Sequence, residues 1–183
     1  MKTYLPDLES CKVAVIGLGY VGLPLAIEIA KTKQCHRTKK NINRTVIGFD
    51  INKNRLAELE KNIDRTNEVS SENLSCSKIF FTNKFEKLLE ADIFIITVPT
   101  PIDSANKPDL SCLKDATNLV ADIIKEKAKF NKKIHPIVIY ESTVFPLATD
   151  DICIKIIEKK SSLTINKDFS CGFSPERINP GDK

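Results

Sequence analysis

Apolar residues follow two different periods along the chain, and the two periods predict different elements. Short unbroken apolar runs predict six strands, over Lys12–Ile16, Thr45–Asp50, Lys78–Thr82, Asp92–Val98, Pro136–Glu141 and Phe169–Phe173. Stretches in which apolar residues recur every three or four positions predict four helices, over Val21–Lys33, Lys53–Asn62, Leu110–Lys129 and Thr149–Lys160. Asp109 or Ser111 is suited to cap the third helix, and Thr149 the fourth.

Strands that alternate with helices are typical of βαβ units in a parallel sheet. Continuous apolar strands such as "DIFIITV" fit a sheet covered on both faces, because each face then needs apolar side chains. The pattern therefore predicts the α/β class, with a doubly wound and mostly parallel sheet. At 183 residues, the chain is long enough for one domain with a core of its own.

The first predicted strand runs into a turn with three glycines, in "KVAVIGLGYVGLPLA". A strand that enters a helix through G-x-G-x-x-G is the dinucleotide-binding fingerprint. Gly17 would allow the tight turn, Gly19 would let a pyrophosphate approach the backbone, and Gly22 would let the helix pack against the strand. The helix that begins near Tyr20 would point its N–H groups at the phosphates. Residues 1–183 are therefore predicted to form a Rossmann-like dinucleotide-binding domain.

An acidic residue, Asp50, ends the second predicted strand, where the fingerprint places the carboxylate that binds the ribose. It lies further from the last glycine than the usual ~20 residues, and a basic insertion at about 34–44 accounts for the surplus. A carboxylate at this point repels a 2′-phosphate, so the sequence favours NAD over NADP.

The segment "KTKQCHRTKKNINR" around this insertion holds six basic residues and no acid. Its simplest interpretation is a solvated surface loop. Lys39, Lys40 and Arg44 could instead reach a 2′-phosphate or a polyanion. Lys53 and Arg55, at the start of the second predicted helix, are better placed to face the cofactor, although surface charge explains them equally well.

Composition excludes several other classes of protein. The chain is 42% hydrophobic and 28% charged, which is ordinary for a folded domain, and its net charge of +4 is mild for a nucleic-acid binder. It has no apolar run of about eighteen residues and no apolar stretch near its start, so neither a membrane span nor a secretion signal is expected. The six cysteines follow no zinc-binding spacing, so no metal site is expected, and they fit reduced thiols in the cytoplasm.

Polar turns follow three of the predicted strands, at the edge where ligands bind in open α/β sheets. The first turn, in "FIITVPTP", brings Thr97 and Thr100. The second, in "VIYESTVFP", brings Glu141 and Thr143, and the third is "GFSPERINPGD". Each alone could be a capped turn, but three together beside a predicted cofactor crevice indicate a functional site.

These motifs carry a resemblance to a known family. The set "GLGYVGLPLA", "IGFDIN", "ITVPTPI", "PDL", "YESTVFP" and "SPERINPGD" resembles the UDP-glucose/GDP-mannose dehydrogenase family. Within it, the chain is most similar to the UDP-N-acetyl-D-glucosamine/galactosamine 6-dehydrogenases of bacterial polysaccharide biosynthesis (the Vi polysaccharide type). The resemblance covers nearly the whole chain except the basic insertion.

The resemblance implies an enzyme that oxidises the C6 alcohol of a UDP-sugar twice, with NAD each time, to a uronic acid. In the family, a cysteine of the C-terminal half forms a thiohemiacetal and then a thioester, which water hydrolyses. That cysteine, the central helix through which the family dimerises, and the UDP-sugar domain have no counterpart in this sequence. The resemblance therefore implies a longer natural protein, a homodimer, and a 183-residue chain that binds NAD but does not turn over.

The resemblance also assigns roles to residues of this sequence. NAD would be held by Gly17, Gly19, Tyr20, Val21, Gly22, Asp50, Arg55, Thr97, Thr100 and Glu141. Thr143 would place the catalytic water, Glu176 would be the acid/base group, and Arg177 and Ile178 would lie along the substrate. One departure is Leu147, which stands where the family usually has glycine and so bears on the turn that carries Thr143.

Two other classes of protein remain open from the sequence. One is a regulatory Rossmann module that senses NAD without catalysis. The other is a different NAD(P)-dependent oxidoreductase, of the 6-phosphogluconate or hydroxyacid type, which shares the fold of the N-terminal part. No motif distinguishes a gluco from a galacto substrate or determines the preference for an N-acetyl group.

Overall fold

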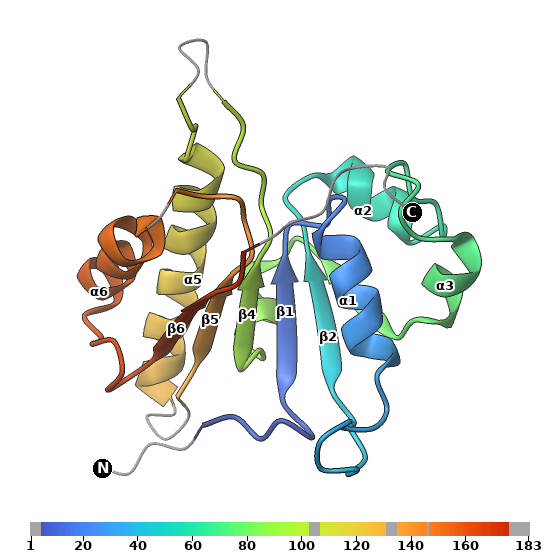
Figure 1. The fold of residues 1–183 in the computed structure, drawn as a ribbon, viewed down its shortest axis with the longest axis horizontal. Helices are drawn as coiled ribbons and strands as arrows, with labels where there is room; N and C mark the ends of the chain where they lie inside the picture. Colours follow the sequence, from blue (N-terminus) through green and yellow to red (C-terminus); the bar gives the residue numbers. More distant parts are fainter. Residues whose placement is uncertain (1–4, 103–106, 131–134, 146, 176–183) are drawn as a thin grey trace.

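The core of the molecule is one sheet of six parallel strands (Figure 1). The structure, a computed structural model, describes residues 5–102, 107–130, 135–145 and 147–175. The strands lie in the order β3-β2-β1-β4-β5-β6. Their bounds are β1 Lys12–Ile16, β2 Thr45–Phe49, β3 Ile79–Thr82, β4 Ile93–Ile96, β5 Ile137–Tyr140 and β6 Ser170–Phe173. This is the strand order of Rossmann folds: successive strands are added on one side of β1 up to β3 and then, from β4, on its other side.

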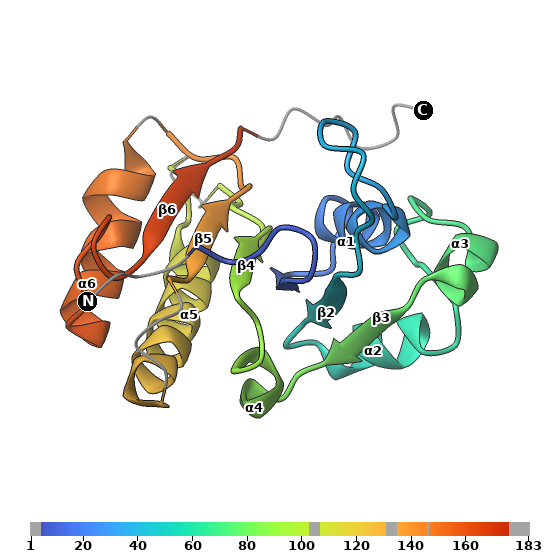
Figure 2. The same ribbon diagram turned by 90° about the horizontal axis from the view of Figure 1, so that it is seen from below.

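Helices cover both faces of the sheet (Figure 2). They are α1 Gly22–Lys31, α2 Lys53–Leu59, α3 Ser71–Cys76, α4 Phe85–Leu88, α5 Ser111–Phe130, a π-helical turn η1 Thr149–Ile154 and α6 Lys155–Ser161. Side chains alternate along β1: Val15 packs with α1, α2 and α3, while Ala14 and Ile16 pack with the opposite layer of α4, α5 and α6. The predicted α/β class and doubly wound sheet are confirmed.

The spacing of apolar residues predicted all of the strands and the longer helices, but not the two shortest helices. All six predicted strands and four predicted helices are present, most of them with slightly shorter bounds. The helices α3 and α4 were not predicted, because six and four residues are too few to display a helical period. Asp109 accepts a hydrogen bond from the Ser111 amide at the start of α5, at 2.9 Å.

The predicted cap at Thr149 is wrong. Thr149 is buried and already lies inside the π-helical turn, and the residue before that turn, Ala148, makes no side-chain capping bond. The π-helical turn continues directly into α6, so the predicted helix over 149–160 exists but does not begin with a polar cap.

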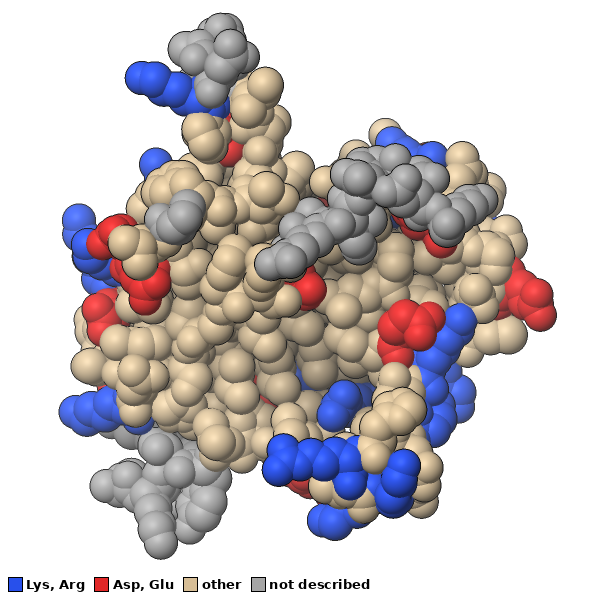
Figure 3. Space-filling view, viewed as in Figure 1, with Lys and Arg blue, Asp and Glu red and all other residues tan. Residues whose placement is uncertain are grey.

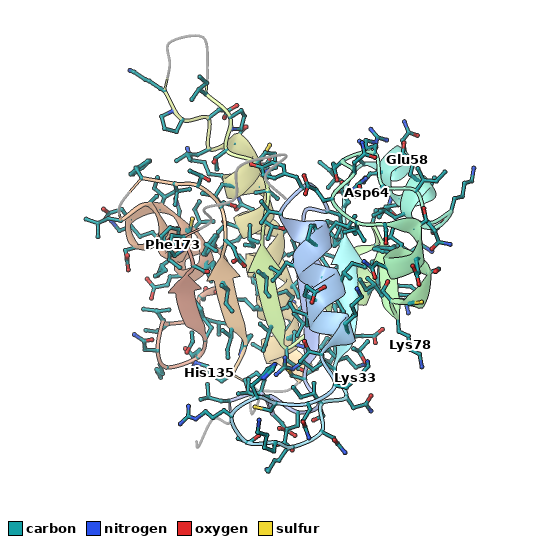
Figure 4. The ribbon with its side chains drawn as sticks, turned by 45° about the vertical axis from the view of Figure 1, so that its right-hand side comes forward. Lys33, Glu58, Asp64, Lys78, His135 and Phe173 are labelled. Atoms are coloured by element: carbon teal, nitrogen blue, oxygen red, sulfur yellow. The ribbon has the colours of Figure 1, made fainter. Side chains whose placement is uncertain are left out.

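The basic segment after α1 lies at the end of the sheet where the strands begin. Figure 3 shows Lys and Arg side chains gathered along that lower edge, and Figure 4 places Lys33 there, far from Asp64 at the other end. The Lys40 ammonium pairs with Glu9 at 2.8 Å, and Arg44 Nε donates to the Leu8 carbonyl at 2.6 Å. The segment is thus a surface loop fastened to the turn that precedes β1.

Two predictions drawn from composition can be compared with the structure. All six cysteines are free thiols, and Cys11 and Cys153 are buried. Burial raises the pKa of the Cys171 thiol to about 12, so this sulfur stays protonated in the folded protein. Among the described residues, no helix is both long and apolar enough to cross a membrane.

Candidate cofactor-binding site

Two cavities flank the turn between β1 and α1, at the carboxyl ends of the strands. The larger, of about 510 Å³, is mostly apolar and lies between this turn, the end of β2 and α5. The smaller, of about 170 Å³, lies beyond β4 and β5. Gly19, Thr97, Val98 and Pro99 line both cavities. Together the cavities form an extended crevice at the point where the strand order reverses, which is where such sheets bind ligands.

Each glycine of the turn answers a different requirement. Gly17 has a φ of +97°, in the region where only glycine is unstrained. A Cβ on Gly22 would lie 1.9 Å from the Gly17 carbonyl oxygen and 2.3 Å from Thr97 Oγ1, so only glycine lets α1 approach β1 this closely. A Cβ on Gly19 would meet no protein atom within 4 Å. The fold itself therefore does not require glycine at position 19. A ligand that approaches this backbone closely would require it, because a side chain would occupy the same space.

The helix α1 begins without a cap from the protein. Val21, which precedes it, makes no side-chain capping bond, and its first turn holds no acidic residue. Within the described part of the chain, the amide groups of Tyr20 and Val21 have no hydrogen-bond acceptor. Unsatisfied N–H groups at the positive end of a helix dipole form an anion-binding site.

The carboxylate of Asp50 is held at the mouth of the larger cavity. Oδ2 accepts from the Leu18 amide at 2.9 Å, and Oδ1 accepts from the Asn52 amide at 2.8 Å. The side chain therefore has a fixed orientation between the glycine turn and α2. Its remaining lone pairs can accept hydrogen bonds from two neighbouring hydroxyl groups.

Arg55 lies behind the glycine turn and not in the wall of either cavity. It is 4% exposed; its Nε donates to the Leu18 carbonyl at 2.8 Å, and its Nη2 pairs with Asp64 Oδ1 at 2.7 Å. Neither Nη1 nor Nη2 makes a hydrogen bond of regular geometry among the described residues, so the contact with Asp64 is an ion pair. Arg55 therefore contacts the glycine turn and not the space of either cavity.

The smaller cavity is lined by hydroxyl groups and one carboxylate. Its walls include Tyr20, Val21, Thr97, Thr100, Glu141, Ser142 and Thr143. Thr97 Oγ1 donates to the Gly17 carbonyl at 2.7 Å and so ties β4 to the glycine turn. Thr100 Oγ1 donates to the Thr143 carbonyl, and Ser142 Oγ donates to the Val98 carbonyl at 2.8 Å. The turns after β4 and β5 are thus bonded to each other, as expected if both belong to one site.

Leu147 has a left-handed backbone. Its φ is +68°, and its side chain is exposed. This conformation costs a residue with a Cβ roughly 1 kcal/mol, which explains why glycine is favoured here. The strained residue lies four positions after Thr143 along the chain.

The larger cavity has one wall that sequence reasoning missed. Cys112, Asp115, Ala116 and Leu119 of α5 line it, together with Ile51. Their spacing along α5 was the available signal, because positions i, i+3, i+4 and i+7 share one helix face. The neighbouring face of α5 carries a stronger apolar stripe, which packs on the sheet, and the sequence pattern indicated that stripe instead.

Three predicted site residues, Glu176, Arg177 and Ile178, lie outside the described residues. Lys39, Lys40 and Arg44 lie on the basic loop, at the end of the sheet where the strands begin (Figure 1), whereas the cavities lie where the strands end. The interpretation that these residues reach a cofactor phosphate is therefore wrong. Lys53 is exposed and lines neither cavity.

The arrangement defines a dinucleotide-binding domain. The space in front of Gly19, the amides at the start of α1 and the Asp50 carboxylate fit a pyrophosphate and a ribose, and Asp50 disfavours a 2′-phosphate. The chain belongs to the UDP-glucose/GDP-mannose dehydrogenase family, since the sequence model of that family's NAD binding domain matches residues 11–183. NAD is accordingly its cofactor.

Known proteins agree with this assignment. The chain is 47% identical over 177 residues to UDP-N-acetyl-D-glucosamine 6-dehydrogenase of Pseudomonas aeruginosa and 42% identical to the enzyme of the same name from Salmonella typhi. Each alignment covers 96% of this chain and 37% of the relative. The solved UDP-D-ManNAc dehydrogenase of Pyrococcus horikoshii is 31% identical, with a TM-score of 0.74 over 93% of this chain and 37% of its own. The chain thus spans little more than a third of the length of these relatives.

Proposed function

We propose that the chain is the cofactor-binding part of an NAD-dependent UDP-N-acetylhexosamine 6-dehydrogenase, which oxidises the C6 alcohol of the sugar to a uronic acid. The observation that carries the proposal is the 47% identity to a relative named for this activity, spread over 96% of the chain. The cavities on either side of the glycine turn support it, because they offer room for the two halves of a dinucleotide.

The proposed roles follow the geometry of the crevice. The backbone amides of Tyr20 and Val21, next to Gly19, bind the pyrophosphate. Gly17 and Gly22 keep the turn and α1 in place. Asp50 accepts hydrogen bonds from the ribose hydroxyls, and the apolar wall of the larger cavity receives the adenine. Arg55 holds the turn from behind. When bound, NAD supplies the acceptor for a hydride.

The smaller cavity is the proposed nicotinamide side. Thr97, Thr100 and Glu141 line it and would orient the ring. Thr143 would hold the water that hydrolyses the acyl intermediate, Glu176 would move protons beside it, and Arg177 and Ile178 would contact the UDP-sugar; these roles rest on the family resemblance.

The setting of the enzyme is also part of the proposal. It would act in the cytoplasm as a homodimer, in the synthesis of a bacterial polysaccharide. Free thiols on the surface, at Cys76 and Cys112, support a reducing compartment. The relatives' names support an N-acetylated UDP-sugar as substrate.

Two measurements test the function. The 183-residue chain should bind NAD in a calorimeter and produce no NADH when a UDP-sugar is added, so steady NADH production by this chain would contradict the proposed division of labour. The natively expressed protein that contains this sequence should reduce NAD with UDP-N-acetylglucosamine or UDP-N-acetylgalactosamine, in preference to UDP-glucose and GDP-mannose. Absence of activity with every UDP-sugar would overturn the proposal.

A further inference from the structure

Asp64 lies in the loop between α2 and α3, and its carboxylate accepts four hydrogen bonds. Its side chain is 1% exposed. Oδ1 accepts from the Thr66 amide at 3.0 Å and the Thr66 hydroxyl at 2.7 Å, and Oδ2 accepts from the amides of Glu68 and Val69, both at 3.0 Å. Burial by itself raises the pKa of this carboxyl, but the hydrogen bonds from Thr66 and Val69 and the adjacent Arg55 guanidinium outweigh it and leave the pKa below its usual value. Asp64 is therefore an anion at neutral pH.

The carboxylate has a second partner on a different element. Arg55, in the first turn of α2, places Nη2 2.7 Å from Asp64 Oδ1, and its side chain is 5% exposed. A buried guanidinium is costly without an anion beside it. Asp64 thus supplies the charge that lets Arg55 stay buried in this orientation.

The other side of Arg55 reaches the glycine turn. Nε donates to the Leu18 carbonyl at 2.8 Å, while the Leu18 amide donates to Asp50 at 2.9 Å. Both peptide groups of Leu18, between Gly17 and Gly19, are therefore held by the segment that follows β2. The amides that face the pyrophosphate come directly after this point in the chain.

We propose that Asp64 is a positioning residue of the NAD site, which fixes the Arg55 guanidinium against the Leu18 carbonyl and so holds the glycine turn in its binding conformation. It touches neither cavity wall, so its effect on the cofactor passes through Arg55. The inference depends on NAD binding at the glycine turn and not on the sugar oxidation proposed above.

The chain offers two matched controls. Glu58 and Arg65 form a second ion pair in the same region, at 2.6 Å, but both side chains are at least about one-third exposed and neither bonds to the turn (Figure 4 labels Glu58 and Asp64). The Thr66 hydroxyl donates a hydrogen bond to the carboxylate that pairs with Arg55, and among the described residues no hydrogen bond joins Thr66 to Leu18. Glu58→Gln tests loss of a nearby charge, and Thr66→Val tests loosening of the loop alone.

The experiment is a double-mutant cycle on the NADH dissociation constant, measured by calorimetry well below the unfolding temperature of every variant. Asp64→Asn should weaken NADH binding about tenfold, since it removes the charge partner of Arg55. In an Arg55→Met background the same change should alter binding less than twofold, because the path through the guanidinium is already gone. Glu58→Gln and Thr66→Val should bind NADH within twofold of the unaltered protein, although Thr66→Val should unfold at a lower temperature.

The outcomes separate the possibilities. Unchanged binding in Asp64→Asn, or an equal loss in both backgrounds, would overturn the positioning role. If Asp64→Asn does not fold, Arg55→Lys takes its place: it keeps the charge but loses the fork between Leu18 and Asp64, and wild-type affinity in that variant would equally overturn the proposal. Tight NADH binding with the expected cycle but no sugar oxidation would overturn only the proposed function, and no NADH binding by the unaltered protein would overturn both.

Discussion

The helices α1 and α2 begin at the same edge of the sheet, one after β1 and the other after β2, yet their first turns differ. At α2 the Asn52 side chain accepts from the amides of Asn54 and Arg55, at 3.0 and 3.2 Å. At α1 no side chain caps the helix, and the preceding residue is Val21. The N–H groups at the start of α2 are satisfied by the protein itself, whereas those before α1 have no acceptor among the described residues, as an anion-binding helix end requires.

The largest expected effect comes from breaking the contact that brings α1 to the crevice. Gly22→Ala would place a methyl group 1.9 Å from the Gly17 carbonyl oxygen, so α1 must move away from β1. We expect a loss of about 3 kcal/mol in the free energy of unfolding, measured by urea denaturation, together with loss of NAD binding. Gly172→Ala is the control, since a Cβ there meets nothing within 4 Å, and a comparable loss in both variants would contradict this account.

A smaller effect should appear in binding alone. Gly19→Ala adds a methyl group that meets no protein atom but projects into the space shared by the two cavities. The dissociation constant of NAD should rise at least about tenfold, or about 1.4 kcal/mol, while the urea midpoint stays unchanged. Wild-type affinity in this variant would mean that the pyrophosphate does not pass in front of Gly19.

The acid between the two helix starts should control the choice of cofactor. Asp50 bonds to the amides of Leu18, before α1, and Asn52, before α2. Asp50→Asn removes the negative charge that faces a 2′-phosphate, so the ratio of NADP to NAD dissociation constants should fall by about tenfold. Competition calorimetry with both cofactors measures the ratio, and a constant ratio would place the ribose elsewhere.

The smallest effect is expected at α2, whose first amides are capped by the Asn52 side chain. Asn52→Ala removes the acceptor for two amides of α2 and should lower the free energy of unfolding by about 1 kcal/mol. NAD affinity should stay within twofold, because the Asn52 amide that bonds to Asp50 is retained and the Arg55 side chain keeps its contacts with Leu18 and Asp64. Thermal unfolding and calorimetry on the same sample give both values. A large loss of NAD affinity in this variant would contradict the distinction drawn between the first turns of α1 and α2.

Sequence reasoning identified, through local backbone demands, the residues that build the glycine turn and the acid beside it. Gly17, Gly22 and Asp50 follow from the way a strand enters a helix, and the structure brings them to one edge. Leu147 was recognised as a departure from the family, and its positive φ supplies the physical reason. Arg55 was expected to face the cofactor, but its burial against Asp64 depends on a loop whose fold no local pattern reveals.

The sequence by itself determined the alternation of strands and helices, the glycine turn and the acid that pairs with it, because these depend on side-chain period and on backbone conformations that few residues adopt. Only the tertiary structure decided what lies opposite the turn. Cys112 and Leu119 reach the larger cavity from α5, and Asp64 reaches Arg55 from beyond α2. These contacts join residues that are distant along the chain, and packing of the two helical layers on the sheet brings them together.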